Sequence, residues 1–177
     1  YLAPGDAELD VVAELLAGGS SSPLGRALVG RGLASAVVSY QLSFELGSFF
    51  FVRAIGAGDT SAAQLMNVIA REVARFSRER FAAQKTRRAI RSLRSGVLAR
   101  MAVPSTRACA LASYQSPDGD VFDTSYAYHR YDDIDSDRVR RTIRRFLRPE
   151  RRVAVLLESY PGAGLPYVFG VSRRPNR

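Results

Sequence analysis

The sequence is short of the residues on which many catalytic and metal-binding sites depend, because its 177 residues include one cysteine and one histidine. A single cysteine, Cys109, excludes an internal disulfide and leaves the redox compartment open. It lies in an apolar helical stretch, so we expect a small core residue rather than a reactive thiol. A metal site on His129 would need distant carboxylates, and no Ser-His or Cys-His catalytic arrangement is recognisable around it.

Long apolar runs are missing too, since no segment approaches the roughly 20 apolar residues that span a bilayer. No signal peptide is visible, but the chain begins at Tyr1 rather than at a methionine, which is typical of an internal fragment. The compartment therefore stays open, and both the bacterial cytoplasm and the periplasm fit. What the chain does have is 46% hydrophobic residues, which is enough for the core of one compact domain.

Lysine is almost absent, although the net charge is +9. Lys85 is the one lysine among 26 basic residues, which is typical of GC-rich bacterial coding rather than of selection for phosphate contacts. The arginines of residues 138–148 fall largely opposite an apolar helical stripe, and no aromatic residues interleave with them as a single-strand binding groove would need. We expect no nucleic-acid partner, and an arginine-rich nucleic-acid-binding module stays an alternative only.

The most informative pattern lies in residues 10–34. The residues of a first apolar helical stripe are Leu9, Val12, Leu15 and Leu16. Gly18 and Gly19 then supply a C-terminal stop, because glycine adopts positive φ at little cost. Ser20–Ser22 can cap a second short helix that holds Pro23 in its first turn, and a strand follows Gly32.

This order of helix, glycine-serine corner, helix and strand resembles the C-terminal type half-domain of the pitrilysin/insulysin-type zinc peptidases, which include the mitochondrial processing peptidases. The similarity covers most of residues 5–161. Its later parts are a long helix opened by Phe81–Lys85, Tyr131, a capped helix at 135–139, Phe146-Leu147-x-Pro149 and a final strand at 152–157. The resemblance implies one half-domain over residues 1–161, with its first strand missing or reduced, and an irregular tail or linker over 162–177.

The departures from this family concern its chemistry. Catalysis there uses H-x-x-E-H on a helix, with two zinc ligands and a general base. His129 lies outside such a motif and no second histidine exists, so the resemblance implies no catalytic residue, no metal ligand and no cofactor in this chain. A family Arg/Tyr pair that helps to hold substrate falls near Val29 and Ser35, and neither residue matches, which leaves the substrate-binding residues unknown.

The hydrophobic pattern predicts an α+β fold, with a mixed or antiparallel sheet and helices packed on one face. Two strands with a short connection predict an antiparallel hairpin. After the corner, the sequence predicts strands at 36–42 and 48–55 and then a helix whose apolar face carries Leu65, Ile69, Val73 and Phe76. A helical stretch over 78–115 follows, kinked near Gly96 and Pro104. The remaining predicted segments are a turn at 116–120, a helix over 137–147 and a strand at 152–158.

Three local motifs resemble chemical sites, and each has a simpler explanation. Gly56-Ala57-Gly58-Asp59 is similar to the anion hole of ribokinase-type sugar kinases, but Asp59 or Thr60 as a helix N-cap explains it. His129 stands among several tyrosines, where a structural or surface role is expected.

The run Asp133-x-Asp135-x-Asp137 begins like an EF-hand loop. The loop fails because Arg138 replaces its glycine and Arg144 replaces its bidentate glutamate. Capping of the following helix by Asp135 or Ser136 is the favoured interpretation.

The resemblance implies a non-catalytic domain in the wall of a peptide-binding chamber. Water activation by zinc would come from a second pitrilysin-type half-domain bearing H-x-x-E-H, in the same polypeptide or in a partner subunit, as an intramolecular pair or a dimer. Peptides would bind by adding to a sheet edge, and residues 36–55 are the expected contact surface. The alternative is a structural or assembly subunit that has left proteolysis, which the mismatches at Val29 and Ser35 favour.

Overall fold

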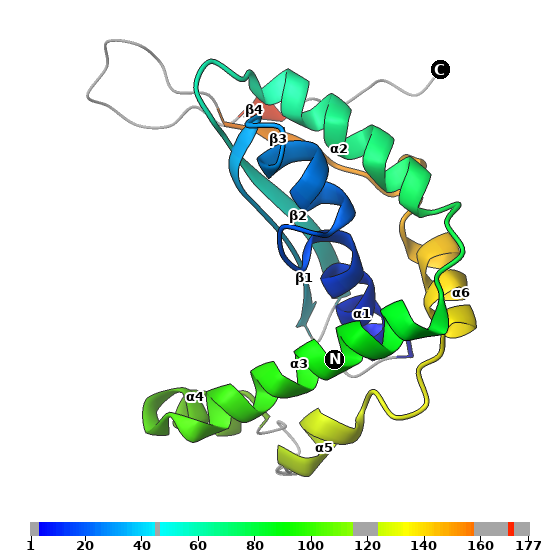
Figure 1. The fold of residues 1–177 in the computed structure, drawn as a ribbon. Coiled ribbons are helices and arrows are strands. Elements are labelled where there is room, and N and C mark those ends of the chain that lie inside the picture. The colour runs from blue at the N-terminus through cyan, green and yellow to red at the C-terminus, as the bar shows by residue number, and fades with distance from the viewer. Residues whose placement is uncertain (1–3, 45–46, 115–123, 158–169, 172–177) are drawn as a thin grey trace.

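The computed structural model of the chain describes residues 4–44, 47–114, 124–157 and 170–171 (Figure 1). In chain order the elements are α1 (Asp6–Ala17), the π-helix η1 (Gly25–Val29), β1 (Ala34–Phe44), β2 (Gly47–Gly56), α2 (Ala62–Phe76), α3 (Ala83–Ala102), α4 (Pro104–Tyr114), α5 (Thr124–His129), α6 (Ser136–Phe146), the 3-10 helix η2 (Pro149–Arg151), β3 (Val155–Leu156) and β4 (Gly170–Val171). None of the described helices is long and apolar enough to span a bilayer.

The predicted glycine-serine corner is confirmed between α1 and η1. Gly18 ends α1 by donating its N–H to the Glu14 carbonyl at 2.8 Å, and Gly19 has φ 100°. Ser22 Oγ accepts from the Gly25 N–H at 3.1 Å and donates to the Gly19 carbonyl at 2.6 Å. These bonds satisfy the polar backbone of the corner, so the chain can reverse direction beside the core.

The strands β1 and β2 form the predicted antiparallel hairpin, with Tyr40 opposite Phe51 and Leu42 opposite Phe49. One side of it, here called the inner side, packs against the core through Val37, Phe50, Val52 and Ala54. In Figure 1, α1 lies along this side of the hairpin. The expectation of a sheet with helices on one face is therefore confirmed, and the register fixes which alternate residues point away.

The core lies between the inner side of the hairpin and the helices. The central helix is α1, which contacts β1, α3 and α6. Its partner α6 buries Val139 and Ile143 from the predicted apolar stripe. The largest fully buried side chains are Phe76, Leu16, Leu24, Leu28, Ile143, Val11, Val12 and Val139.

The long helical stretch predicted over 78–115 is two helices, α3 and α4. The chain stays helical through Gly96 and breaks at Val103, which adopts φ −100° and ψ 120° because the residue before a proline is disfavoured in an α-helix. The prediction of a core position for Cys109 is wrong, since this residue is exposed. Figure 1 shows the reason: α4 lies at the outer end of α3, away from α1.

The predicted strand at 152–158 is much shorter, because η2 extends its hydrogen bonding to Arg152. What remains is β3, which pairs antiparallel with β4 in a ladder separate from the hairpin. Residue 158 and the predicted turn at 116–120 lie outside the described residues. β4 falls in the segment for which an irregular tail was expected, and the domain boundary at residue 161 stays a prediction.

Candidate interaction surface

Polar side chains fasten the inner side of the hairpin to α1. The Asp6 carboxylate accepts hydrogen bonds from Gln41 Nε2 at 2.6 Å and from Ser43 Oγ at 2.8 Å. Ser39 Oγ donates to the Ala13 carbonyl at 2.7 Å. Because Asp6 is only 6% exposed, its desolvation is compensated by these bonds, and they hold β1 at a fixed register along α1.

The opposite side of the hairpin, here called the outer face, is apolar and exposed. It consists of Val38, Tyr40, Leu42, Phe44, Phe49, Phe51, Arg53 and Ile55. Its aromatic rings form a continuous ladder: Tyr40 stacks on Phe51 at 5.3 Å between centroids, and Phe49 lies 5.9 Å from Phe51. Phe49 is 60% exposed, so the ladder faces solvent rather than the core.

The polarity of β1 is the reverse of what alternation suggests. In a half-buried strand the apolar residues face the core and the polar residues face water. Here the polar set, Ser39, Gln41 and Ser43, faces inward because α1 offers it hydrogen-bond partners. The apolar alternate residues are left on the outer face. Sequence reasoning named the hairpin as a contact surface but missed this face, although the run Phe49–Val52, apolar on both sides, was a signal for it.

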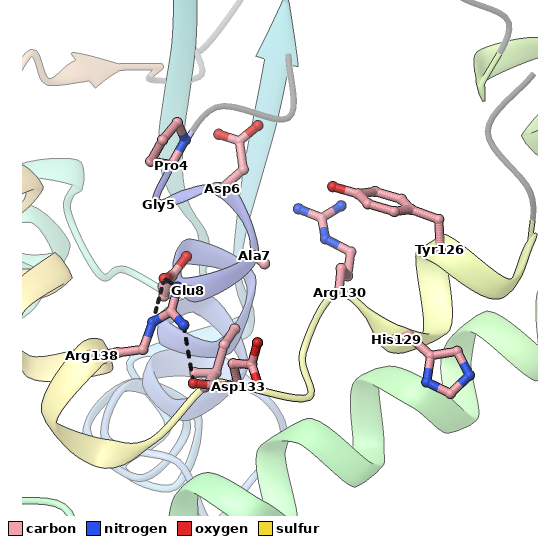
Figure 2. A pocket seen from close by; sticks show the side chains of 11 residues that line it. Pro4, Gly5, Asp6, Ala7, Glu8, Tyr126, His129, Arg130, Asp133 and Arg138 are labelled. Carbon is pink, nitrogen blue, oxygen red and sulfur yellow. Dashed lines mark hydrogen bonds and ion pairs between the residues drawn. The ribbon is translucent and has the colours of Figure 1, made fainter. Parts of the chain in front are cut away.

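A cavity of about 290 Å³ lies between the start of α1 and the segment that joins α5 to α6 (Figure 2). Two of its charged groups, Glu8 and Arg138, bind each other. Arg138 donates to Glu8 Oε1 from Nε at 3.1 Å and from a terminal nitrogen at 2.8 Å, and it also reaches the Asp133 carbonyl at 3.2 Å. The Glu8–Arg138 pair therefore ties α6 to α1 at this cavity.

A second group of polar contacts surrounds Asp10, in the middle of α1. Tyr131 Oη donates to Asp10 Oδ2 at 3.1 Å, and an Arg130 nitrogen lies 3.5 Å from the same oxygen. Burial raises the pKa of Asp10, although Arg130 and the hydrogen bond from Tyr131 act in the opposite direction. Burial and the Asp10 charge also raise the pKa of Tyr131. Arg130 Nε is buried without a hydrogen-bond partner among the described residues, so one donor of this group of contacts is unsatisfied.

His129 lies at the exposed end of α5. Its Nδ1 is 2.9 Å from Asp132 Oδ2, and its ring meets Tyr128 edge-on at 5.2 Å. Arg94 binds the same Asp132 carboxylate. In the described part of the chain, no three His, Cys, Asp or Glu side chains gather as a metal site would require. The surface role expected for His129 agrees with this position, and the residues present do not fit a bound zinc ion.

The two family substrate positions lie near the start of the hairpin. Val29 is the last residue of η1 and is 39% exposed. Ser35 sits at the β1 irregularity, where its Oγ donates to the Ile55 carbonyl at 3.4 Å. Neither side chain offers a cation or a phenol to a substrate, and their lack of a substrate role stays a prediction.

The EF-hand-like run at 133–137 and the glycine-rich run at 56–59 both lie at or just before the start of a helix. Asp135 is the N-cap of α6 and accepts from the Arg138 N–H at 2.7 Å, which lowers the pKa of its carboxyl, so capping by Asp135 is confirmed. The cap predicted at Asp59 or Thr60 is wrong by one or two residues. Ser61 caps α2 instead, accepting from the Gln64 N–H at 3.2 Å, because Asp59 and Thr60 still belong to the turn after β2.

The fold and these contacts define a class: an α+β domain whose helices cover one side of a hairpin, with structural rather than catalytic polar clusters in its described part. The chain belongs to the peptidase M16 inactive domain family, whose sequence model matches residues 2–93. The predicted membership and the prediction that this domain is inactive are thereby confirmed. A search of curated proteins gave no match.

Solved structures share the fold. One is the inactive peptidase domain of a Bordetella parapertussis protein that is assigned as a zinc protease. It is 20% identical to this chain and has a TM-score of 0.73, and the match covers 99% of this chain and 87% of that domain. A protein from Bordetella pertussis, also assigned as a zinc protease, is 23% identical and has a TM-score of 0.67. The match covers 84% of this chain and 82% of that protein. A protease from Helicobacter pylori is 18% identical with a TM-score of 0.69; the match covers 84% of this chain but spans only 36% of that protease.

Proposed function

We propose that this inactive domain forms part of the wall of a peptide-binding chamber and pairs with a pitrilysin-type half-domain that carries H-x-x-E-H. That half-domain belongs to the same polypeptide or to a partner subunit. The observation that supports the proposal most strongly is the one-sided helical cover: α1 packs on the inner side, and the apolar outer face stays open for a neighbour. Zinc, with its activation of water, belongs in the other half-domain.

The contribution of this domain is to hold a peptide, not to cleave it. Within the described residues β1 and β2 form a two-stranded sheet, so each has a free edge with backbone N–H and C=O groups available. An extended peptide that adds to such an edge gains main-chain hydrogen bonds with little dependence on its sequence. This mode of binding needs none of the polar clusters described above, and it suits a domain without a catalytic group.

A structural or assembly role is the second candidate. The observation that favours it is the absence of an Arg/Tyr pair at Val29 and Ser35, where the resembled family helps to hold its substrate. A domain of this kind would keep the pairing surface and lose the peptide.

The test is to purify the intact gene product that contains this segment, with an affinity tag, from its source cells. The captured material is analysed for zinc and for cleavage of an unstructured peptide, with and without a chelator. We expect zinc and chelator-sensitive cleavage, with H-x-x-E-H in the intact product or in a captured partner. A stable assembly without zinc and without cleavage contradicts the proposal and favours the structural role.

A matched control separates binding from chemistry. Replacing the glutamate of the H-x-x-E-H motif with glutamine in the captured partner, or in the intact product, removes the general base and leaves both zinc-binding histidines in place. Cleavage should be lost while zinc and the assembly persist. Cleavage that survives this change would point to a different protease in the captured material.

A further inference from the structure

The outer face exposes more apolar surface than a solvated hairpin would keep. Its seven large apolar side chains are between 37% and 60% exposed. Since an aromatic side chain has about 150–250 Å² of surface, the four rings alone leave about 350 Å² exposed, and the aliphatic side chains bring the patch to about 500 Å². Patches of this size on single domains commonly mark interaction sites.

The shape of the patch favours a protein domain over a small ligand. Small molecules bind in concave pockets that cover most of their surface. The outer face is one side of a two-stranded ladder, and the cavity of Figure 2 lies elsewhere, beside α5 and α6. An area of about 500 Å² with a surrounding rim approaches the roughly 800 Å² that one partner contributes to a standard protein interface.

The charge of the patch argues against a second copy of this chain. Arg53 is the one charged residue in β1 and β2, and it lies opposite Val38 in the register. It is exposed and has no ion pair among the described residues. Self-association through this face would bring together two apolar patches, each with its own arginine, on two chains of net charge +9. An unpaired cation is costly to bury, so the face suits a partner that supplies a carboxylate.

We propose that the outer face is the docking surface for a second protein domain, whose own contact face is apolar and places a carboxylate opposite Arg53. Resting on the proposed function, that domain is the half-domain that carries H-x-x-E-H. The Tyr40, Phe51 and Phe49 rings already contact one another before the partner arrives. Their order reduces the conformational entropy lost on binding, and an aromatic cluster beside an arginine is the usual composition of an interface hot spot.

The test is site-specific photo-cross-linking of the intact gene product in its source cells. A benzophenone amino acid is placed at Leu42 or Phe49 on the outer face and, as controls, at Leu98 or Val155. Both control residues are more than half exposed and lie outside the hairpin. The cross-linked peptides are identified by mass spectrometry. We expect the outer-face positions to cross-link to one defined domain at least tenfold more than the controls do.

The charge of the partner is tested by Arg53→Glu in the Phe49 cross-linking protein. The yield should fall at least tenfold, because the substitution sets like charges opposite each other. The matched control is Arg87→Glu, which makes the same charge change at an exposed position of α3 and should alter the yield less than twofold. Melting temperatures of the purified variants show whether either substitution disturbs the fold.

The outcomes separate this inference from the proposed function. Cross-links to a second copy of the chain, to peptides alone, or at no more than control yield overturn the docking surface. The proposed function then survives if zinc and chelator-sensitive cleavage still accompany the purified protein. Cross-links to an apolar, acid-bearing domain without H-x-x-E-H, in material without zinc, keep the docking surface and overturn the proposed function.

Discussion

The two sides of the β1–β2 hairpin use alternate residues of the same strands for opposite purposes. The inner side combines Phe50 and Val52 with the polar tether from Asp6, and it is covered by α1. The outer face presents an aromatic ladder to solvent. Between Ser39 and Phe44 of β1, polar side chains therefore lie on the covered side and apolar side chains on the exposed side, which is the reverse of the usual arrangement in a half-buried sheet.

The inner side of the hairpin therefore contributes to folding, and the outer face is available for association with another molecule. The inner side gains stability within the chain, since its polar side chains bind α1 and its apolar side chains pack against the core. The outer face gains little until something covers it, because its rings contact one another and remain largely exposed. Substitutions on the inner side and in its helices should therefore change stability, whereas those on the outer face should change binding.

The largest expected effect comes from the helix that backs the inner side. Leu16 in α1 is fully buried, and Leu16→Ala removes its contacts and leaves a cavity, so the free energy of unfolding should fall by about 2–5 kcal/mol. Phe49→Ala removes a larger side chain from the outer face and should cost less than about 1 kcal/mol. Urea unfolding of both variants measures the contrast, and equal losses would show that the outer face also stabilises the fold.

The polar tether should contribute less than the core. Asp6→Ala leaves the amide of Gln41 and the hydroxyl of Ser43 without their buried acceptor, at a cost of about 1–3 kcal/mol. Asp6→Asn keeps one acceptor oxygen and should recover part of the loss. The control is Asp59→Ala at an exposed turn position, which should stay within about 0.5 kcal/mol of the parent in the same urea titration.

The cap of α2 gives a smaller effect and tests the corrected assignment. Ser61→Ala removes the acceptor of the Gln64 N–H and should lower stability by about 1 kcal/mol. Thr60→Ala changes the neighbouring residue, which the sequence alone also offered as a cap, and should cost much less. Thermal melts of the two variants decide between the positions, and the assignment fails if Thr60→Ala is the more damaging.

The smallest expected effect is a pH dependence from Asp10. Burial raises its pKa in the folded state above 3.8, so the folded protein binds more protons than the unfolded chain in that range. Stability from this group is thus present below pH 3.8 and is lost as the pH rises through the raised pKa. Asp10→Asn should reduce the dependence of the free energy of unfolding on pH, which urea titrations from pH 3 to 6 would measure.

Asp135 supplies the contrasting case for the same titrations. Its backbone hydrogen bond from Arg138 lowers its pKa, so its contribution is present above pH 3.8 and is lost as the pH falls through the lowered value. Asp135→Asn should therefore remove the slope that this group gives to stability below pH 3.8 and leave the slope above pH 3.8 unchanged. A slope above pH 3.8 that persists in Asp10→Asn would assign the dependence to another group.

The sequence determined the local structure and the family. The spacing of apolar residues placed α1 and α6, the glycines at 18 and 19 ended the first helix, and two β-rich runs with a short connection gave the hairpin. These features depend on neighbours a few residues apart, for which side-chain periodicity and backbone preference are sufficient. The same patterns, in their order, led to the peptidase M16 inactive domain.

Only the tertiary structure decided which side of the hairpin is covered and where solvent begins. Ser39, Gln41 and Ser43 face inward because Asp6 and the Ala13 carbonyl, 26–37 residues away in sequence, satisfy them. Cys109 is exposed because α4 lies beyond the core, although its local sequence suits burial. Both results depend on which distant groups meet, and local periodicity carries no information about that.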